Sequence, residues 1–228
     1  MRLLEYRAAI FDLDGTLVQS EPAWEEAKRR VLAQMGVSVG QEVYDAFVGR
    51  GLRGFLAEVL GPDLPEARRA ELASRIGAEA DVLLPQMRQP VPGAAEAVTR
   101  LVAGGLRIAV CSSSPRRHIH AALAQLGLTD RVSAIVSGAD LPRGKPDPLP
   151  YLETLRLLAV EPAAAFAVED ALPGAVSAHA AGLAVIGIGA ESLKPEFAPY
   201  CRQQVADFHD FRQRFLPARP APGRAGAG

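Results

Sequence analysis

Short apolar runs alternate along the chain with segments in which apolar residues recur at helical spacing. The runs at residues 8–13, 106–111, 133–136, 165–168 and 184–188 have the length and composition of buried parallel strands. Between most of them, the spacing predicts helices at residues 94–103, 119–126, 149–158 and 175–181. Strands that alternate with helices predict an α/β fold with a doubly wound, Rossmann-like parallel sheet as its core.

The alternation of predicted strands and helices is interrupted once, between the first two apolar runs. Residues 14–105 are too many for a simple connection between neighbouring strands. Helical patterns cover residues 21–35, 41–60 and 66–87, and glycine or proline separates them. We therefore predict an inserted α-helical cap at residues 18–90, lying over the end of the first strand, and a catalytic core made of residues 1–17 and 91–216. The Pro-, Gly-, Ala- and Arg-rich residues 217–228 are expected to be disordered.

Composition narrows the class of protein. The 228 residues are 49% hydrophobic, and 25 basic residues against 26 acidic ones leave a formal net charge of −1. This balance predicts no nucleic-acid partner, and no apolar stretch approaches the roughly 20 residues of a membrane-spanning helix. Asp12 and Asp14 interrupt the first apolar segment, which a signal peptide would not tolerate. Two cysteines make no disulfide framework. We expect a cytoplasmic protein without a membrane partner.

The first candidate chemistry follows the first predicted strand. Asp12 and Asp14 stand two residues apart, and Gly15 then frees the backbone. The carboxyl ends of parallel strands are where ligands bind, and side chains at i and i+2 point the same way. An Asp-rich turn that merely closes the strand explains this segment equally well.

Two further strands are followed by groups suited to phosphate. Ser112, Ser113 and Ser114 end the second strand just before a helix, where hydroxyls and backbone amides bind phosphate oxygens, although helix capping is the simpler explanation of these serines. Lys145 follows the third strand in a loop stiffened by Pro146 and Pro148. A rigid loop suits a fixed positive charge beside a phosphate, but taken singly a surface lysine is the more ordinary interpretation.

The fourth strand ends in Glu169 and Asp170. Two adjacent carboxylates are costly to crowd together unless a cation neutralises them, and Mg²⁺ prefers such oxygens. Helix capping by Asp170 is the alternative. Each motif alone is ambiguous, but all four follow predicted strands and therefore meet at one edge of the sheet. A nucleophile, a hydroxyl donor, a cation and a metal site are together the requirements of phosphoryl transfer.

With these four motifs in this order, the chain resembles the haloacid dehalogenase (HAD) superfamily. Within the superfamily it resembles the branch with a helical cap after the first strand, and there the members like phosphoglycolate phosphatase and β-phosphoglucomutase. The resemblance covers residues 8–189. It implies that Asp12 is the nucleophile that forms an aspartyl-phosphate and that Asp14 is the general acid and base. It also implies that Ser112 and Lys145 hold the transferring phosphoryl group. Magnesium would be bound by Asp12, Glu169, Asp170 and the backbone carbonyl of Asp14.

The expected function is a Mg²⁺-dependent phosphatase of a small phosphorylated metabolite, acting as a monomer. A β-phosphoglucomutase-like sugar phosphomutase is the alternative. It ranks second because Trp24 and Leu52 stand where the mutases carry a histidine and an arginine. A non-catalytic phospho-ligand sensor is a third hypothesis, but a pure binder would not need both Asp12 and Asp14.

In this family the cap selects the substrate, so Trp24, Arg50 and Arg53 are candidates for substrate binding together with Ser112, Ser113 and Lys145. Trp24 either stacks on a sugar or fills the cap interface. For Phe47 and Phe55 we favour simple packing between cap and core.

Overall fold

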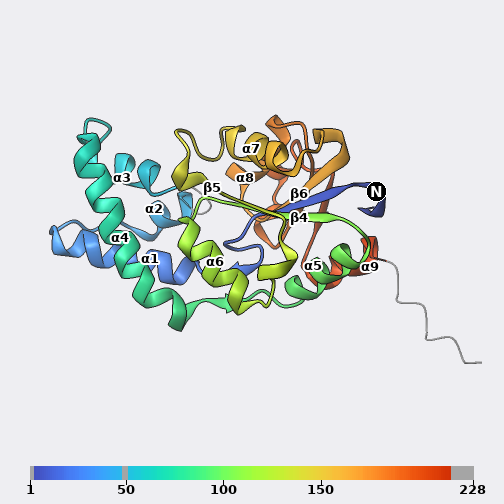
Figure 1. Cartoon of the computed structure of the whole chain (residues 1–228). Helices are drawn as coiled ribbons and strands as arrows, with labels where there is room; N and C mark the ends of the chain where they lie inside the picture. Colours follow the sequence, from blue (N-terminus) through green and yellow to red (C-terminus); the bar gives the residue numbers. More distant parts are fainter. Residues whose placement is uncertain (1–2, 48–50, 217–228) are drawn as a thin grey trace, which may run out of the picture.

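The computed structural model describes residues 3–47 and 51–216. Its centre is a six-stranded sheet in which every neighbouring pair is parallel, in the order β5-β4-β1-β6-β7-β8 (Figure 1). The strands are β1 (Ala8–Phe11), β4 (Arg107–Ser112), β5 (Ala134–Ser137), β6 (Ala165–Glu169), β7 (Ala184–Ile188) and β8 (Gln203–Val205). The chain winds outward in one direction from β1 through β4 to β5 and then in the other from β6, so the strand order reverses beside β1. The doubly wound fold expected from the sequence is confirmed.

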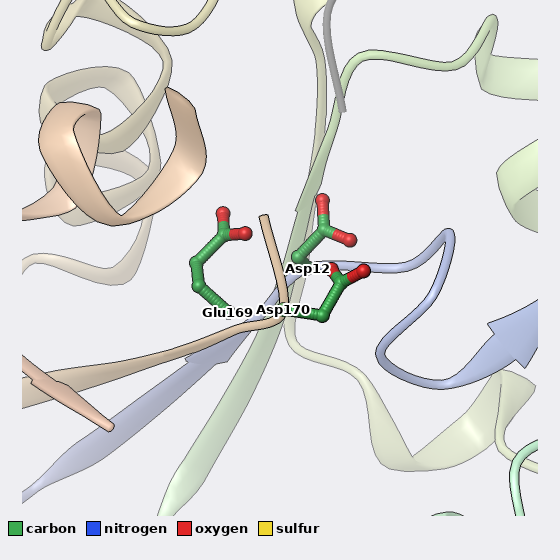
Figure 2. A group of neighbouring side chains, drawn as sticks. All are labelled: Asp12, Glu169 and Asp170. Atoms are coloured by element: carbon green, nitrogen blue, oxygen red, sulfur yellow. The ribbon is translucent and has the colours of Figure 1, made fainter. Parts of the chain in front are cut away.

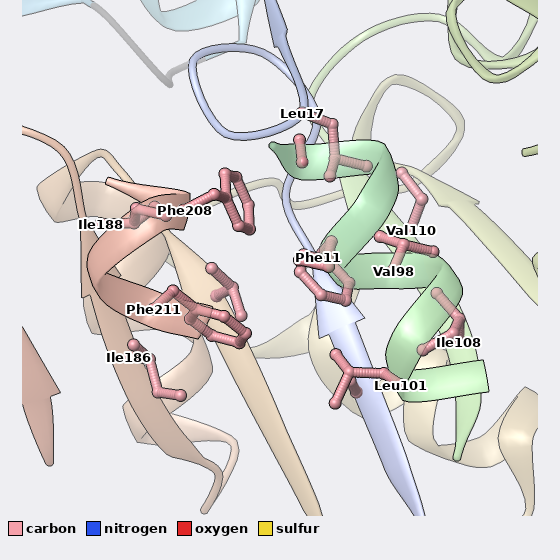
Figure 3. Close-up of a cluster of buried hydrophobic side chains, with 14 of the residues drawn as sticks. Phe11, Leu17, Val98, Leu101, Ile108, Val110, Ile186, Ile188, Phe208 and Phe211 are labelled. Carbon is pink, nitrogen blue, oxygen red and sulfur yellow. The ribbon is translucent and has the colours of Figure 1, made fainter. Parts of the chain in front are cut away.

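Both faces of the sheet are covered, because side chains of β1 alternate between two hydrophobic clusters. Ala9 and Phe11 face a cluster built with α5 (Ala94–Ala103), α6 (Arg116–Gln125) and α9 (Phe208–Phe215), part of which Figure 3 shows. Ala8 and Ile10 face the opposite cluster, under α7 (Leu149–Leu158) and α8 (Leu172–Ala180). All four strand residues are fully buried. Burial on both faces explains why the strand reads as one continuous apolar run.

Four helices lie beyond the carboxyl ends of the strands (Figure 1). They are α1 (Glu21–Gln34), α2 (Gln41–Ala46), α3 (Leu52–Leu60) and α4 (Glu66–Met87), called the insertion helices below. They share a third cluster of buried side chains, whose members in the described part of the chain all come from residues 23–84. The chain enters and leaves this unit through a small antiparallel pair, β2 (Val18–Gln19) with β3 (Gln89–Pro90). This arrangement supports the predicted division at residues 18 and 90, which remains a prediction.

Several elements differ from the sequence-based expectations. Two helices stand where one was expected over residues 41–60. The first, α2, ends before Phe47, and α3 begins after Gly51, whose extended backbone forms the N-cap of α3. The strand β8 was not predicted, since it is three residues long and two of them are glutamine. The small strands β2 and β3 and the helix α9 were also missed. Helices α6 and α8 begin three residues earlier than expected, at Arg116 and Leu172.

The remaining regular elements in the described ranges are short 3-10 helices at Leu3–Glu5, Thr129–Arg131, Gly138–Asp140, Pro162–Ala164, Glu191–Leu193 and Pro195–Phe197. Within residues 3–47 and 51–216, no helix is long and apolar enough to cross a membrane. The tail that we expect to be disordered, residues 217–228, lies outside the described residues.

Candidate active site

The predicted site residues meet where the strand order reverses. Asp12 directly follows β1, and Glu169 is the last residue of the neighbouring strand β6. Ser112 ends β4 on the other side of β1. Lys145 comes from the loop between β5 and α7. The parallel register places these strand ends at one edge of the sheet, so the fold brings together residues that are far apart in sequence.

Three carboxylates converge at this edge, as Figure 2 shows. Asp12, Glu169 and Asp170 each offer an oxygen, and these oxygens all lie within 4.8 Å of one another. The carboxylate of Asp14 is not part of this group. Such a cluster of hard oxygen ligands suits a divalent cation such as Mg²⁺.

Lys145 supplies the positive charge within the cluster. Its Nζ donates to Asp12 Oδ1 and to Glu169 Oε1, both at 2.6 Å, and to the carbonyl oxygen of Cys111 at 2.9 Å. The side chain is only 3% exposed, so the alternative of a surface lysine does not apply. Tyr151 lies beside it and donates its hydroxyl to the same Glu169 oxygen. One cation therefore faces three acids, which leaves the cluster short of positive charge.

The pKa values reflect this imbalance. Burial raises the pKa of Asp12 well above its usual range, although Lys145 pulls it down in part. Burial, together with repulsion from Glu169, raises the pKa of Asp170 to about 8, against a hydrogen bond from Thr16 that lowers it. Burial alone would lower the pKa of Lys145, but the carboxylates of Asp12 and Glu169 outweigh it and raise that pKa. An added cation would stabilise the ionised forms of Asp12 and Asp170 and so lower their pKa values.

Two glycines leave room for these acids. A Cβ at Gly15, where φ is +92°, would lie 1.9 Å from Asp170 Oδ2. A Cβ at Gly174 would lie 2.1 Å from Glu169 Oε2. A side chain at either position would displace the neighbouring acid, so both carboxylates pack against bare backbone.

Asp14 is held apart from the carboxylate cluster by three serine hydroxyls. Ser114 Oγ donates to Asp14 Oδ2 at 2.7 Å and Ser112 Oγ donates to the same oxygen at 3.1 Å. Ser20, between β2 and α1, donates to the other oxygen. The second acid of the first motif is thus positioned by groups from both the core and the start of the insertion.

The capping alternatives are contradicted. The N-cap of α6 is Pro115 and that of α8 is Ala171, and neither helix has a side-chain cap hydrogen bond. Ser114 instead contacts Asp14, and Asp170 accepts from Thr16 at 3.1 Å.

Sequence reasoning missed the roles of Thr16, Ser20, Ser114 and Tyr151. Thr16 follows the motif of Asp12 and Asp14, and Ser114 belongs to the serine motif after the second strand. Their place in these motifs could have indicated a role in the site. Ser20 and Tyr151 carry no such signal, because each reaches its acid only through the tertiary fold.

A cavity of about 610 Å³ opens beside Asp12, Asp14 and Lys145 and extends to the insertion helices. Trp24 and Ser113 line it, as does Arg53, whose side chain is 60% exposed and lies 3.7 Å from Glu66. Arg50 falls outside the described residues. Trp24 is buried and its ring lies 5.0 Å from that of His118 on α6, so it lines the cavity and packs against the core at once.

The packing expected of Phe47 and Phe55 between cap and core is wrong. Both belong to the hydrophobic cluster of the insertion, where their rings meet edge to face at 5.8 Å, and Phe47 also lines the cavity. Apolar character predicted their burial but not the side on which they are buried.

A family model for haloacid dehalogenase-like hydrolases matches residues 6–182. The chain belongs to this family. Hexitol phosphatase B of Escherichia coli K12 is 33% identical over 196 residues, which cover 80% of this chain and 83% of that protein. Phosphoglycolate phosphatase of Cereibacter sphaeroides is 35% identical over 178 residues, covering 76% and 81%.

The fold of this HAD-like hydrolase also matches that of solved proteins. A crystal structure of β-phosphoglucomutase from Clostridium difficile superimposes with a TM-score of 0.80, over 92% of this chain and 96% of that one, at 19% identity. At that identity the match shows the fold alone. The resemblance expected from the motifs is confirmed, and the chain is an enzyme of the phosphoric monoester hydrolase class, as its named relatives are.

Proposed function

We propose that this HAD-like hydrolase is a Mg²⁺-dependent phosphatase that removes phosphate from a small phosphorylated metabolite through an aspartyl-phosphate on Asp12. The observation that carries the proposal is the convergence of three carboxylates and one buried lysine, with a separately held second aspartate, at a cavity that Asp12, Asp14 and Lys145 line. Each part has a use in phosphoryl transfer, and the cavity provides room for the leaving group.

The donor set fits magnesium. Asp12, Glu169 and Asp170 would hold the ion, with the backbone carbonyl of Asp14 as a further ligand. These are hard oxygen donors, and the raised pKa values of Asp12 and Asp170 mark a site that lacks positive charge. When bound, Mg²⁺ would offset the negative charge of the phosphoryl oxygens.

In the first step, a carboxylate oxygen of Asp12 attacks phosphorus and the bond from phosphorus to the leaving oxygen breaks. Asp14 gives a proton to that oxygen, so the metabolite leaves as an alcohol. Lys145 Nζ, 2.6 Å from Asp12 Oδ1, favours the ionised form of the nucleophile and lies where it can meet a phosphoryl oxygen. Ser112 adds a hydroxyl donor from the end of β4.

In the second step, Asp14 takes a proton from water, and the resulting hydroxide attacks phosphorus. The bond between phosphorus and the Asp12 oxygen breaks, inorganic phosphate leaves, and both aspartates return to their starting states. The hydroxyls of Ser20, Ser112 and Ser114 fix the place of Asp14 before the reaction. All of these groups come from one chain, so a monomer suffices.

The test is phosphate release from phosphorylated sugars, hexitol phosphates, phosphoglycolate, nucleotides and p-nitrophenyl phosphate, with Mg²⁺ and with EDTA. Asp12→Asn is the control variant, and circular dichroism checks that it folds. We expect release that needs Mg²⁺ and disappears in Asp12→Asn. Release that survives in Asp12→Asn would overturn the aspartyl-phosphate.

The phosphomutase remains the alternative outcome of the same assay. The likeness to β-phosphoglucomutase is one of fold, and hydrolysis is what the names of the relatives describe. Absence of release from every compound, followed by interconversion of hexose phosphates with a bisphosphate activator, would favour the mutase.

A further inference from the structure

Lys28 is a buried cation that the proposed mechanism does not use. It lies on α1 and is 5% exposed, and it lines the cavity that begins at Asp12 and Asp14. Glu21 and Trp24 line the same cavity. Residues 21, 24 and 28 are spaced three and four apart, so they form one face of α1. This face of the insertion looks toward the phosphoryl site.

The other cations that line the cavity in the described part of the chain have carboxylate partners. Lys145 is bound by Asp12 and Glu169, Arg117 Nε lies 2.8 Å from Asp81, and Arg53 lies 3.7 Å from Glu66. Within residues 3–47 and 51–216, Lys28 has neither a hydrogen bond nor an ion pair within 4 Å. Its Nζ lies over the ring of Phe55, 5.1 Å from the ring centroid.

The nearby acids do not neutralise Lys28. Glu25 is engaged elsewhere, with Arg29 at 2.5 Å and Gln41 at 3.0 Å. Burial lowers the pKa of Lys28, and the charges of Glu21, Glu25 and Asp14 offset this only in part. A buried ammonium is costly without an anion, and a ring contact compensates for only part of that cost.

We propose that Lys28 binds an anionic group, a carboxylate or a second phosphate, at the end of the substrate remote from the transferred phosphoryl group. This rests on the proposed phosphatase function. The cavity of about 610 Å³ leaves room for a substrate longer than a two-carbon acid. The substrate class is therefore a phosphorylated sugar acid or a sugar bisphosphate.

Matched substrates isolate the remote group. Gluconate 6-phosphate and glucitol 6-phosphate have the same carbon chain and differ at the far end, carboxylate against alcohol. Fructose 1,6-bisphosphate and fructose 6-phosphate make the same comparison for a second phosphate. We expect a higher kcat/KM for the anionic member of at least one pair, and the pair that shows it identifies which anion is bound.

The variant is Lys28→Met, which keeps the length of the side chain and removes its charge. We expect the ratio of kcat/KM for the anionic over the neutral substrate to fall about 10- to 100-fold, mainly through KM, as for loss of a charge-assisted hydrogen bond. Lys28→Arg, which keeps the charge, should retain part of the preference. Lys194→Met removes an exposed lysine that is paired with Glu191, and should leave the ratio unchanged.

An unchanged ratio in Lys28→Met, or an equal loss on both members of each pair, overturns the role of Lys28. Failure of the proposed function looks different, because the wild-type protein would then release no phosphate even from p-nitrophenyl phosphate. Calorimetry in the Asp12→Asn background measures the same ratio as dissociation constants. A protein that turns nothing over therefore still tests Lys28, and equal affinities with and without Lys28→Met would refute it.

Discussion

Lys145 Nζ lies 2.6 Å from Asp12 Oδ1, although 133 positions separate the two residues along the chain. The contact joins the loop after β5 to the end of β1. It places a buried cation on the proposed nucleophile, whose pKa burial raises and Lys145 lowers. Lys145 therefore favours the ionised, nucleophilic form of Asp12.

Replacing Lys145 with methionine should impair both catalysis and stability. Asp12 and Glu169 would lose their shared cation while staying buried, which typically costs about 3–5 kcal/mol. We expect kcat/KM for p-nitrophenyl phosphate to fall at least about 100-fold, because the charge on the phosphoryl group is no longer offset. Steady-state kinetics and urea unfolding measure the two effects. Turnover within about threefold of wild type would show that Lys145 is structural only.

Asp14→Asn should separate the two chemical steps. Loss of p-nitrophenolate needs little help from an acid, whereas breakdown of the aspartyl-phosphate needs a base. We expect a burst of p-nitrophenolate equal to the enzyme concentration, followed by turnover about 100- to 10,000-fold slower than wild type. Rapid-mixing absorbance measures the burst, and mass spectrometry should find one phosphate on the protein. Asp12→Asn should give no burst, and a burst there would mean another nucleophile.

The sequence predicted most of the sheet and most of the site for the same physical reason. Strands buried on both faces read as apolar runs, and each carries its functional group at its carboxyl end, so Asp12, Ser112 and Glu169 could be placed before their contacts were known. The residues that the sequence did not reveal are those whose role depends on three-dimensional packing. Lys28 and Ser20 resemble ordinary residues at a helix, and only the cavity and the contact with Asp14 distinguish them.

Asp170 should make the stability of the metal-free protein depend on pH. Its pKa is about 8 in the fold and near 4 when unfolded, so the folded state binds more protons between these values. Stability must then fall as pH rises from 6 to 8. In EDTA, we expect the Tm of wild type to drop over this range by about 5–9 °C more than that of Asp170→Asn.

Added Mg²⁺ should raise the Tm of the wild-type protein, most strongly at pH 8, and should do so much less in Asp170→Asn, which lacks one ligand. Differential scanning fluorimetry measures both series. Asp130→Asn, at an exposed acid away from the sheet edge, should behave as wild type. Equal Mg²⁺ shifts in Asp170→Asn and wild type would remove Asp170 from the metal site.

Gly15→Ala should damage the metal site as well as the backbone. Its φ of +92° already disfavours a side chain, and the new Cβ would lie 1.9 Å from Asp170 Oδ2. Gly36→Ala is the matched control, because φ there is +70° and a Cβ would meet nothing within 4 Å. Both variants should lose about 1–2 kcal/mol of stability through backbone strain.

Only Gly15→Ala should displace the Asp170 carboxylate, so only this variant should need more Mg²⁺, about tenfold or more, for half-maximal activity. Magnesium titration of phosphate release at fixed pH measures this difference. If both glycine variants show the same magnesium requirement as wild type, Asp170 can move away from Gly15 without affecting the ion, and the close packing seen at this strand end is not what positions the metal ligand.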